Sequence, residues 1–214
     1  MTKATVIKAG RPKSQQKRKQ ILLAAGELFL VHGFSGCSMD MVAKHSDVSK
    51  QTVYSHFENK EALFTAVIKA KCEDYQLNSS HLEHESGRFE DILQQSGLQI
   101  IRLLHDSQVI AIYRVVIGEI SNNPRVAELF YEAGPQHSLD LLAQCFQSFT
   151  DGQLSAQKAM QGAVMYFNLL KGEFHTRSIL GLDFALSPEQ QYAQVAAATH
   201  ALQHFLKTQL GETI

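Results

Sequence analysis

Two short helical patterns between residues 38 and 57 constrain this chain more than any other feature. Ser38 precedes the first pattern and Ser49 the second, and a serine at either place can accept hydrogen bonds from the free amides of a first helical turn. Residues 46–49 between the two patterns predict a tight turn. Because helices this short are unstable alone, we expect helices on both sides to hold them in place.

The flanking segments carry the apolar periodicity of such supporting helices. Apolar residues recur at spacings of three and four from Gln15 onward, and Gly33 predicts the end of that helix in a left-handed conformation. Asn59 predicts the cap of a longer helix that runs from Lys60 toward Tyr75. The apolar faces of these two helices are formed by Ile21, Leu22, Ala25, Leu28, Phe29, Leu63, Phe64, Val67 and Ile68.

The second short helix, from Lys50 to Phe57, has one apolar and one polar side. Val53 and Phe57 are four residues apart and are predicted to face inward. A short helix with this division is typical of a recognition helix in the DNA major groove. The polar residues expected to face outward are Lys50, Gln51, Thr52, Ser55 and His56.

Residue type suggests which of these side chains would read bases. The amide of Gln51 can pair with N6 and N7 of adenine, which makes Gln51 the best candidate for a base contact. Lys50 can read guanine or only touch a phosphate, and Thr52 can meet a thymine methyl group or a phosphate. Both alternatives stay open from the sequence.

Other residues of the same segment are suited to hold the DNA backbone. Tyr54, His56 and Ser38 can donate hydrogen bonds to phosphates. Lys60 adds a positive charge at a helix N-terminus, where anions bind well, and Arg18 adds one near the start of the first helix. The alternative is a buried helical hairpin with solvated polar side chains, and the combination of caps, short helices and polar face argues against it.

Charge is distributed unevenly along the chain. Residues 1–75 carry 12 lysines and arginines against 7 acidic residues, a net charge of +5, whereas residues 76–214 carry 8 against 14, a net charge of −6. The two sum to the overall formal charge of −1. A basic first third suggests that a polyanion-binding module is joined to a different second part.

Residues 15–75 resemble the N-terminal head of TetR-family regulators. The resemblance covers roughly 60 contiguous positions in the right order. It departs from the family pattern at Ser46-Asp47, where the family usually has Ala-Gly, and Asp tolerates the left-handed conformation that a glycine suggests. The matching stretches are residues 21–29, 33–34, 38–43, 48–57 and 59–64.

The remainder of the chain also has a helical pattern. Strand signals are nearly absent, which predicts an all-α chain of about nine helices. One helix is expected to end at Gly134-Pro135, and Ser155 is expected to cap another that reaches Leu170. The predicted organisation is a flexible basic arm at 1–14, a helix-turn-helix DNA-binding domain at 15–75 with the motif itself at 38–57, and a regulatory ligand-binding and dimerisation domain at 76–214.

A second resemblance falls within that regulatory part. Residues 113–120, Pro124 and residues 129–135 resemble the C-terminal domain of AefR-like regulators. The resemblance implies an all-α body that senses a ligand and forms dimers. The sequence itself adds that large apolar residues are too numerous for surface use.

Some of these apolar residues are candidates to line an effector cavity, although each one alone is more typical of ordinary core. A medium-sized, largely apolar effector is expected, with a few polar groups converging on it. The polar candidates are Arg102, Tyr113, Arg114, Glu119 and His175. The other candidates are Phe89, Ile101, Leu104, Ile112, Val116, Phe130, Phe146, Met165 and Phe167.

The last two long helices are predicted to form the dimer interface, because small residues there permit close approach of helices. The alternative is that their apolar stripe packs only within its own subunit. The small residues are Gly162, Ala163, Ala196, Ala197 and Ala201. The candidate interface residues are Ala163, Phe167, Tyr192, Val195, Ala196, Thr199, Leu202, Phe205 and Leu206.

These features together predict a cytoplasmic, ligand-responsive homodimer that represses transcription from palindromic double-stranded DNA, with no cofactor and no membrane segment. Activation, or regulation of both signs by the same fold, is the first alternative, and an architectural DNA binder is another. Cys37, Cys72 and Cys145 form no disulfide or metal pattern, which leaves reduced thiols or a redox sensor.

A helical metal-dependent enzyme is the least favoured alternative. His81 and His84 lie in a polar connector near acidic residues, and His200 and His204 have the spacing of a helical metal pair. The sequence contains no His-Glu-x-x-His, no Gly-x-Ser-x-Gly and no phosphate-binding loop. A surface or interface role is the simpler interpretation of the paired histidines.

Overall fold

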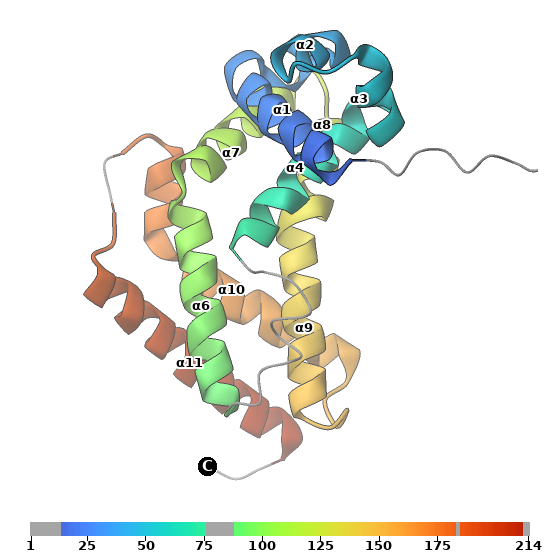
Figure 1. Cartoon of the computed structure of the whole chain (residues 1–214). Coiled ribbons are helices and arrows are strands. Elements are labelled where there is room, and N and C mark those ends of the chain that lie inside the picture. The colour runs from blue at the N-terminus through green and yellow to red at the C-terminus, as the bar shows by residue number, and fades with distance from the viewer. Residues whose placement is uncertain (1–13, 76–87, 183–184, 212–214) are drawn as a thin grey trace, which may run out of the picture.

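The structure is a computed structural model that describes residues 14–75, 88–182 and 185–211. Within these ranges it contains ten α-helical segments and no strand, which confirms the predicted all-α class. Because α8 continues through a π-helical turn into α9, the ten segments make nine separate helices (Figure 1). The predicted basic arm at 1–14 lies outside the described residues except for Ser14.

The first four helices form the head. They are α1 (Gln15–Gly36), α2 (Met39–His45), α3 (Lys50–His56) and α4 (Lys60–Asp74). Each of the predicted caps is present: Ser38 accepts from the Met41 amide, Ser49 from that of Thr52, and Asn59 from that of Ala62. The turn between α2 and α3 also behaves as expected, since Asp47 has a φ of 51°.

Three phenylalanines fill the centre of the head. The ring of Phe29 lies 5.1 Å from that of Phe64 and 5.9 Å from that of Phe34, and the Phe34 and Phe64 rings are 5.3 Å apart. Aromatic pairs of this kind contribute about 0.5–1.5 kcal/mol each beyond area burial. They hold α1, its C-terminal turn and α4 together, and this gives the two short helices a fixed base.

Gly33 marks the end of the regular part of α1, but not in the predicted conformation. Its φ is 70° and its ψ is 177°, which is outside the left-handed helical region and accessible mainly to glycine. The chain then makes one further turn to Gly36 in a new direction. The predicted stop is therefore correct in position and wrong in geometry.

The remaining helices form the body. They are α6 (Phe89–His105), α7 (Ser107–Glu119), α8 (Arg125–Tyr131), the π-helical turn η1 (Glu132–Gln136), α9 (His137–Phe149), α10 (Ala156–Ile179) and α11 (Pro188–Leu210). The predicted helix end at Gly134-Pro135 is wrong, because the wider π turn accommodates a proline that lacks an N–H group.

The helix that Ser155 caps also extends further than Leu170. It reaches Ile179 after a kink at Gly172, whose φ of 52° breaks the regular helix. The side-chain amide of Gln194 on α11 donates to the Leu169 and Leu170 carbonyls at 2.9 Å each. These bonds satisfy carbonyl groups near the kink and join α11 to it.

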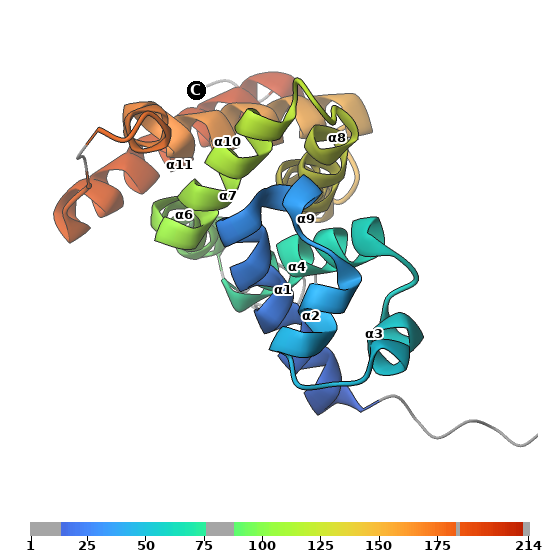
Figure 2. The same ribbon diagram turned by 90° about the horizontal axis from the view of Figure 1, so that it is seen from above.

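Two buried clusters organise the described chain. One joins the apolar residues of α1–α4 to α7 and α8 through residues such as Val116 and Phe130. The other joins α6, α9, α10 and α11 around Phe146 and Tyr166. The head thus shares its core with two body helices. The recognition helix α3 and the last helix α11 lie at opposite ends of the molecule (Figures 1 and 2).

None of the described helices has the length and apolarity needed to cross a membrane.

Candidate nucleic-acid interface

The outer side of α3 presents polar groups on a fixed base. Val53 is fully buried and Phe57 is 5% exposed, so the two inward residues anchor the helix as predicted. Lys50, Gln51 and Ser55 are exposed, as is Tyr54, while Thr52 and His56 are half-buried. The side chain of Gln51 therefore extends from a short rigid helix toward solvent, as a base contact requires.

Lys50 is held against α2 by an exposed ion pair. Its Nζ lies 2.8 Å from Asp40 Oδ1 and 5.9 Å from the centre of the Tyr54 ring. Hydrogen bonding to Asp40 and its negative charge raise the pKa of Lys50, which is fully charged at neutral pH. Surface pairs of this kind are weak, so a DNA phosphate or guanine can displace Asp40.

The hydroxyl groups of the helix-turn-helix already make local hydrogen bonds. Ser49 Oγ and Thr52 Oγ1 are 2.8 Å apart, and Ser55 donates to the Thr52 carbonyl at 2.7 Å. A phosphate contact by Ser55 would require that bond to break. Ser38 accepts from the Met41 amide, and its own proton remains available for a phosphate oxygen.

Lys60 lies in a different environment from the one predicted. Its Nζ donates to the carbonyls of Phe34 at 2.8 Å and Cys37 at 2.9 Å, and it lies 4.5 Å from the centre of the Phe34 ring. These contacts direct the ammonium group into the head and occupy it there. In the described state Lys60 thus fixes the connection between α1 and α2, and its predicted phosphate contact, which would compete with these bonds, stays a prediction.

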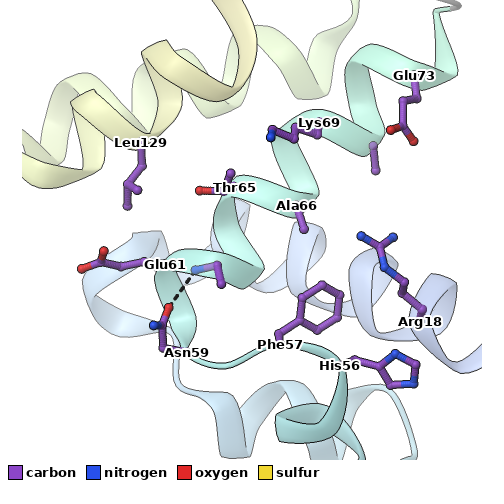
Figure 3. A pocket seen from close by; sticks show the side chains of 12 residues that line it. Arg18, His56, Phe57, Asn59, Glu61, Thr65, Ala66, Lys69, Glu73 and Leu129 are labelled. Atoms are coloured by element: carbon purple, nitrogen blue, oxygen red, sulfur yellow. Dashed lines mark hydrogen bonds between the residues drawn. The ribbon is translucent and has the colours of Figure 1, made fainter. Parts of the chain in front are cut away.

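A hollow of about 530 Å³ runs along α4 beside the recognition helix (Figure 3). Figure 3 shows Arg18 and His56 beside Phe57, and the guanidinium carbon of Arg18 lies 5.3 Å from the centre of the Phe57 ring. Lys69 and Glu73 on α4 also line the hollow. Arg18 thus lies half-buried next to α3 and lines the hollow, and its predicted phosphate contact stays a prediction.

A small cavity lies at the junction of the head with the body, between α4, α6, α7, α9 and α10. Its volume is about 40 Å³, far below the ~300–1,000 Å³ of a typical ligand pocket, so this cavity as described is too small for an effector. A groove of about 210 Å³ between α1, α4 and α7 adjoins it and shares Ile68, Lys71, Val109 and Ile112. The candidate effector residues that line the small cavity are Leu104, Ile112, Tyr113, Phe130 and Phe167.

The other candidate effector residues lie elsewhere. Phe89 packs against Phe146 at a ring distance of 6.0 Å, and Ile101 is fully buried. Val116 belongs to the cluster shared with the head, and Met165 is partly buried against the body core. None of these five residues lines the small cavity, so packing of the core accounts for them in this state.

His175 is buried behind Tyr113. It is 1% exposed, its ring centre lies 4.8 Å from that of Tyr113, and neither ring nitrogen makes a hydrogen bond of normal geometry. Burial and the charge of Lys171 lower the pKa of His175 to about 4, so the ring is neutral at neutral pH. Burial raises the pKa of Tyr113 to about 12, and its hydroxyl keeps its proton beside the cavity.

The predicted dimer residues point mostly into their own subunit. Gly162 explains this, because a Cβ atom there would lie 3.3 Å from both Leu202 and Phe205 of α11. The small residues thus bring α10 close to α11 of the same chain, and Phe205 is only half-buried by that contact. The candidates that are buried within their own subunit, and so are corrected, are Ala163, Phe167, Val195, Thr199, Leu202 and Leu206.

A different set of residues on these two helices is exposed. Tyr192, at 51% exposure, and Ala196 are the two original candidates among them. We call this surface the α10–α11 face; its members are Val164, Leu169, Tyr192, Ala193, Ala196 and Ala197. A helical stripe in the sequence indicates an apolar side but not whether a neighbour within or outside the subunit covers it.

The structure also bears on the cysteines and histidines. Burial raises the pKa of Cys72 and Cys145 to about 11 and raises that of Cys37, which makes these thiols poor nucleophiles. Among the described residues no three metal-ligating side chains cluster. The pair His81 and His84 lies outside the described residues.

Sequence reasoning missed three polar residues that join the elements. Asp40 pairs with Lys50 across the turn, and Ser35 is hydrogen-bonded to Glu119 of α7. Arg114, considered only as a ligand group, donates to the Ser178 and Ile179 carbonyls at the end of α10. The Ser35 and Arg114 contacts bridge distant parts of the chain, and no local pattern indicates any of the three.

Comparison with known proteins adds matches in both halves of the chain. Residues 21–67 match the model of bacterial regulatory proteins of the tetR family, and residues 91–206 match that of the AefR-like transcriptional repressor C-terminal domain. The regulator UidR of Escherichia coli is 32% identical over 117 residues, which cover 54% of this chain and 58% of UidR. The activator FasR of Mycolicibacterium smegmatis is 39% identical over 54 residues, 25% of each chain.

Solved structures match over most of the chain. The flavonoid-responsive regulator FrrA has 32% identity and a TM-score of 0.68 over 91% of this chain and 97% of its own. A TetR-family regulator from Mesorhizobium loti has 26% identity and a TM-score of 0.71 over 91% and 98%.

Proposed function

This chain belongs to the TetR family of DNA-binding transcriptional regulators, whose members are not enzymes, and from that premise we propose that it is a homodimeric repressor released from a palindromic operator by a largely apolar effector. The observation that carries the proposal is the outer side of α3, where Gln51 and Lys50 are exposed above the buried Val53. Gln51, Lys50 and Thr52 read bases, and Ser38, Tyr54, His56 and Arg18 hold the backbone.

The α10–α11 face supports the dimeric part of the proposal. Val164, Leu169 and Tyr192 expose 39%, 42% and 51% of their surfaces, and Ala193, Ala196 and Ala197 of α11 are exposed as well. An exposed apolar face of this kind favours association with a second copy through two-fold symmetry. Two copies joined there would carry their α3 helices away from the interface, where each could contact one half-site of a palindrome.

The junction between head and body supports an effector site. The small cavity is lined by Leu104, Ile112, Tyr113 and Phe130 and adjoins the groove beside α1. Enlargement of that cavity would admit a flat apolar molecule, with the Tyr113 hydroxyl as a polar contact. FrrA is described as flavonoid-responsive, and aromatic polyphenols are therefore the first compounds to test.

The proposal is tested by selecting bound sequences from random or genomic duplex DNA with the purified full chain. The expected product is a palindrome with half-sites one helical turn apart. A panel of polyphenols should include one that weakens binding of the chain to this DNA by about fivefold or more. Selection of no sequence, or of DNA without symmetry, contradicts the operator part. Retained DNA binding with every apolar compound contradicts the effector part.

Activation of transcription is the second candidate function, because the relatives include both a named activator and a named repressor. FasR is named an activator, and BepR of Brucella suis, 27% identical over 96 residues, is named a repressor. A reporter placed behind the selected operator separates the two. Lower expression with the chain present supports repression, and higher expression supports activation.

A further inference from the structure

The short connection between α1 and α2, residues 33–37, is held by side chains from two other helices. Glu119, the last residue of α7, accepts hydrogen bonds from the Ser35 amide at 2.9 Å and from the Ser35 hydroxyl. Lys60 of α4 donates to the carbonyls of Phe34 and Cys37. We call residues 33–37 the α1–α2 joint. Since α2 begins at Met39, the joint determines the direction in which the helix-turn-helix leaves α1.

The backbone of the joint is shaped to receive the Glu119 carboxylate. Gly33 has a φ of 70°, and a Cβ atom at that position would lie 2.5 Å from Glu119 Oε1. Burial alone would raise the pKa of Glu119, but hydrogen bonds from Ser35 and the Phe34 amide, with the charge of Lys60, lower it. Glu119 is only half-buried, so the strength of the contact comes mainly from convergent donors rather than from low dielectric.

The opposite end of α7 is tied to α4. Asp106 caps α7 by accepting from the Gln108 and Val109 amides. It also accepts from Lys71 at 2.8 Å and from the Tyr75 hydroxyl at 2.7 Å. Movement of the α7 N-terminus relative to α4 therefore breaks a charged contact, which makes the two helices move together.

The middle of α7 contacts both the cavity and α10. Ile112 and Tyr113 line the small cavity, and Arg114 donates to the Ser178 carbonyl at 2.6 Å and the Ile179 carbonyl at 3.0 Å. A helix of this length spans about 20 Å, so one rigid element joins the cavity, the end of α10 and the joint. A ligand that enlarges the cavity on the side of Ile112 and Tyr113 would displace α7, and α7 ends at Glu119.

We propose that Glu119 is a positioning residue, through which α7 sets the orientation of the helix-turn-helix and so the spacing of the two recognition helices. The inference rests on the proposed function and adds the route by which the body controls the head. Glu119 touches no DNA in this account. It acts through Ser35 and Gly33 on the start of α2.

The test uses DNA with variable half-site spacing and needs no effector. Operators selected with the unmodified chain are rebuilt with half-sites one or two base pairs closer or further apart. The unmodified chain should bind the selected spacing about tenfold or more tightly than the altered spacings. Glu119→Ala should reduce this ratio of affinities to about threefold or less. Ser35→Ala should act in the same direction, and the double variant should lose no more than Glu119→Ala alone.

Glu173→Ala is the matched control, because Glu173 is an exposed glutamate on α10 paired with Arg177. It should keep the full spacing preference. A Glu119→Ala chain that still prefers one spacing about tenfold overturns the proposal, and so does a uniform loss of affinity at all spacings, which a merely structural role would produce. If the unmodified chain selects no operator, the proposed function itself has failed, and that outcome is distinct from a failure of Glu119→Ala alone.

Discussion

Lys50 and Lys60 carry the same charged group in the same head, and their surroundings give them different roles. Lys50 is exposed and paired with Asp40, a weak contact that DNA can replace. Lys60 donates to two backbone carbonyls and lies over the Phe34 ring, where an ammonium group stabilises the connection from α1 to α2. Residue type alone predicted a phosphate contact for both, and only the geometry separates them.

This difference yields a matched pair of variants. Lys60→Met should lower the free energy of unfolding by about 1–3 kcal/mol, because two carbonyls lose a charged donor. Its effect on the salt dependence of DNA binding should be small. Lys50→Met should leave the free energy of unfolding almost unchanged. If Lys50 contacts a phosphate, this variant should also reduce the slope of log binding constant against log salt concentration by about one. Urea unfolding and binding titrations over a salt series measure both. An equal loss of slope in Lys60→Met would contradict the assignment.

Gln51 is the residue on which sequence preference should depend most. Gln51→Ala should cost about 1–3 kcal/mol on the selected operator and much less on operators with the paired base changed. Gln161→Ala, which truncates an exposed glutamine on α10, is the control and should bind every operator as before. Competition binding against single-base operator variants measures the effect. Equal weakening on all variants would show that Gln51 reads no base.

At the scale of helices, α7 makes polar contacts with three neighbours along its length. Asp106 joins its N-terminus to α4, Arg114 joins its middle to α10, and Glu119 joins its C-terminus to the head. Its apolar residues Ile112 and Val116 belong to the core of the head. The predicted domain boundary near residue 75 lies between α4 and α6 in the sequence. In space, however, α7 and α8 share the buried core of the head.

The Asp106 contact predicts a dependence of stability on pH. Burial alone would raise the pKa of Asp106, but hydrogen bonds from Lys71, Tyr75 and the Val109 amide outweigh it and lower the pKa. A lowered pKa in the folded state means that the contact stabilises the fold above the unfolded value of about 3.9 and is lost as the pH falls below it.

Asp106→Asn keeps the cap and removes the charge. Its free energy of unfolding should be lower than that of the unmodified chain by about 1–3 kcal/mol near neutral pH. The difference should shrink as the pH falls from about 4 through the lowered pKa of the folded carboxylate, where the unmodified chain takes up its proton. Denaturant unfolding followed by circular dichroism at several pH values measures this. A difference that stays constant down to the lowest pH would contradict the account.

The elements that could be predicted from sequence are those set by local chemistry. The caps at Ser38, Ser49 and Asn59 depend on a hydroxyl or amide beside free N–H groups, and the inward side of α3 depends on a spacing of four residues. The kink at Gly172 was missed because it depends on Gln194 of another helix. The π turn at Pro135 was missed because proline usually ends a helix.

The prediction of the dimer-interface residues was wrong for a related reason, because it too depends on contacts between distant helices. The stripe that includes Val195, Leu202 and Leu206 has the correct period for a buried face, and it is buried, but by its own subunit. The effector candidates were drawn from the same apolar pool, in which core and cavity residues are identical in type. Period and composition indicate that a side chain is covered, whereas the identity of its neighbour depends on the tertiary arrangement.

For the whole molecule, the α10–α11 face predicts the oligomeric state. Val164→Asp places a charge on that face, where Val164 is 39% exposed, and should convert the dimer to a monomer because an unpaired charge is costly in an apolar interface. Val31→Asp on α1, where the valine is 73% exposed, is the matched control and should remain dimeric. Sedimentation velocity measures both. A dimeric Val164→Asp chain would place the interface elsewhere.

The central claim concerns the recognition helix and its two-fold partner. The most direct test is a footprint of the purified full chain on the DNA selected by it, at moderate salt. The account predicts a protected palindrome whose two half-sites are about 10 base pairs apart from centre to centre, on the same face of the duplex. It also predicts that Gln51→Ala weakens protection of both halves together. Protection of a single asymmetric site, or coating of the duplex without sequence preference, would contradict it.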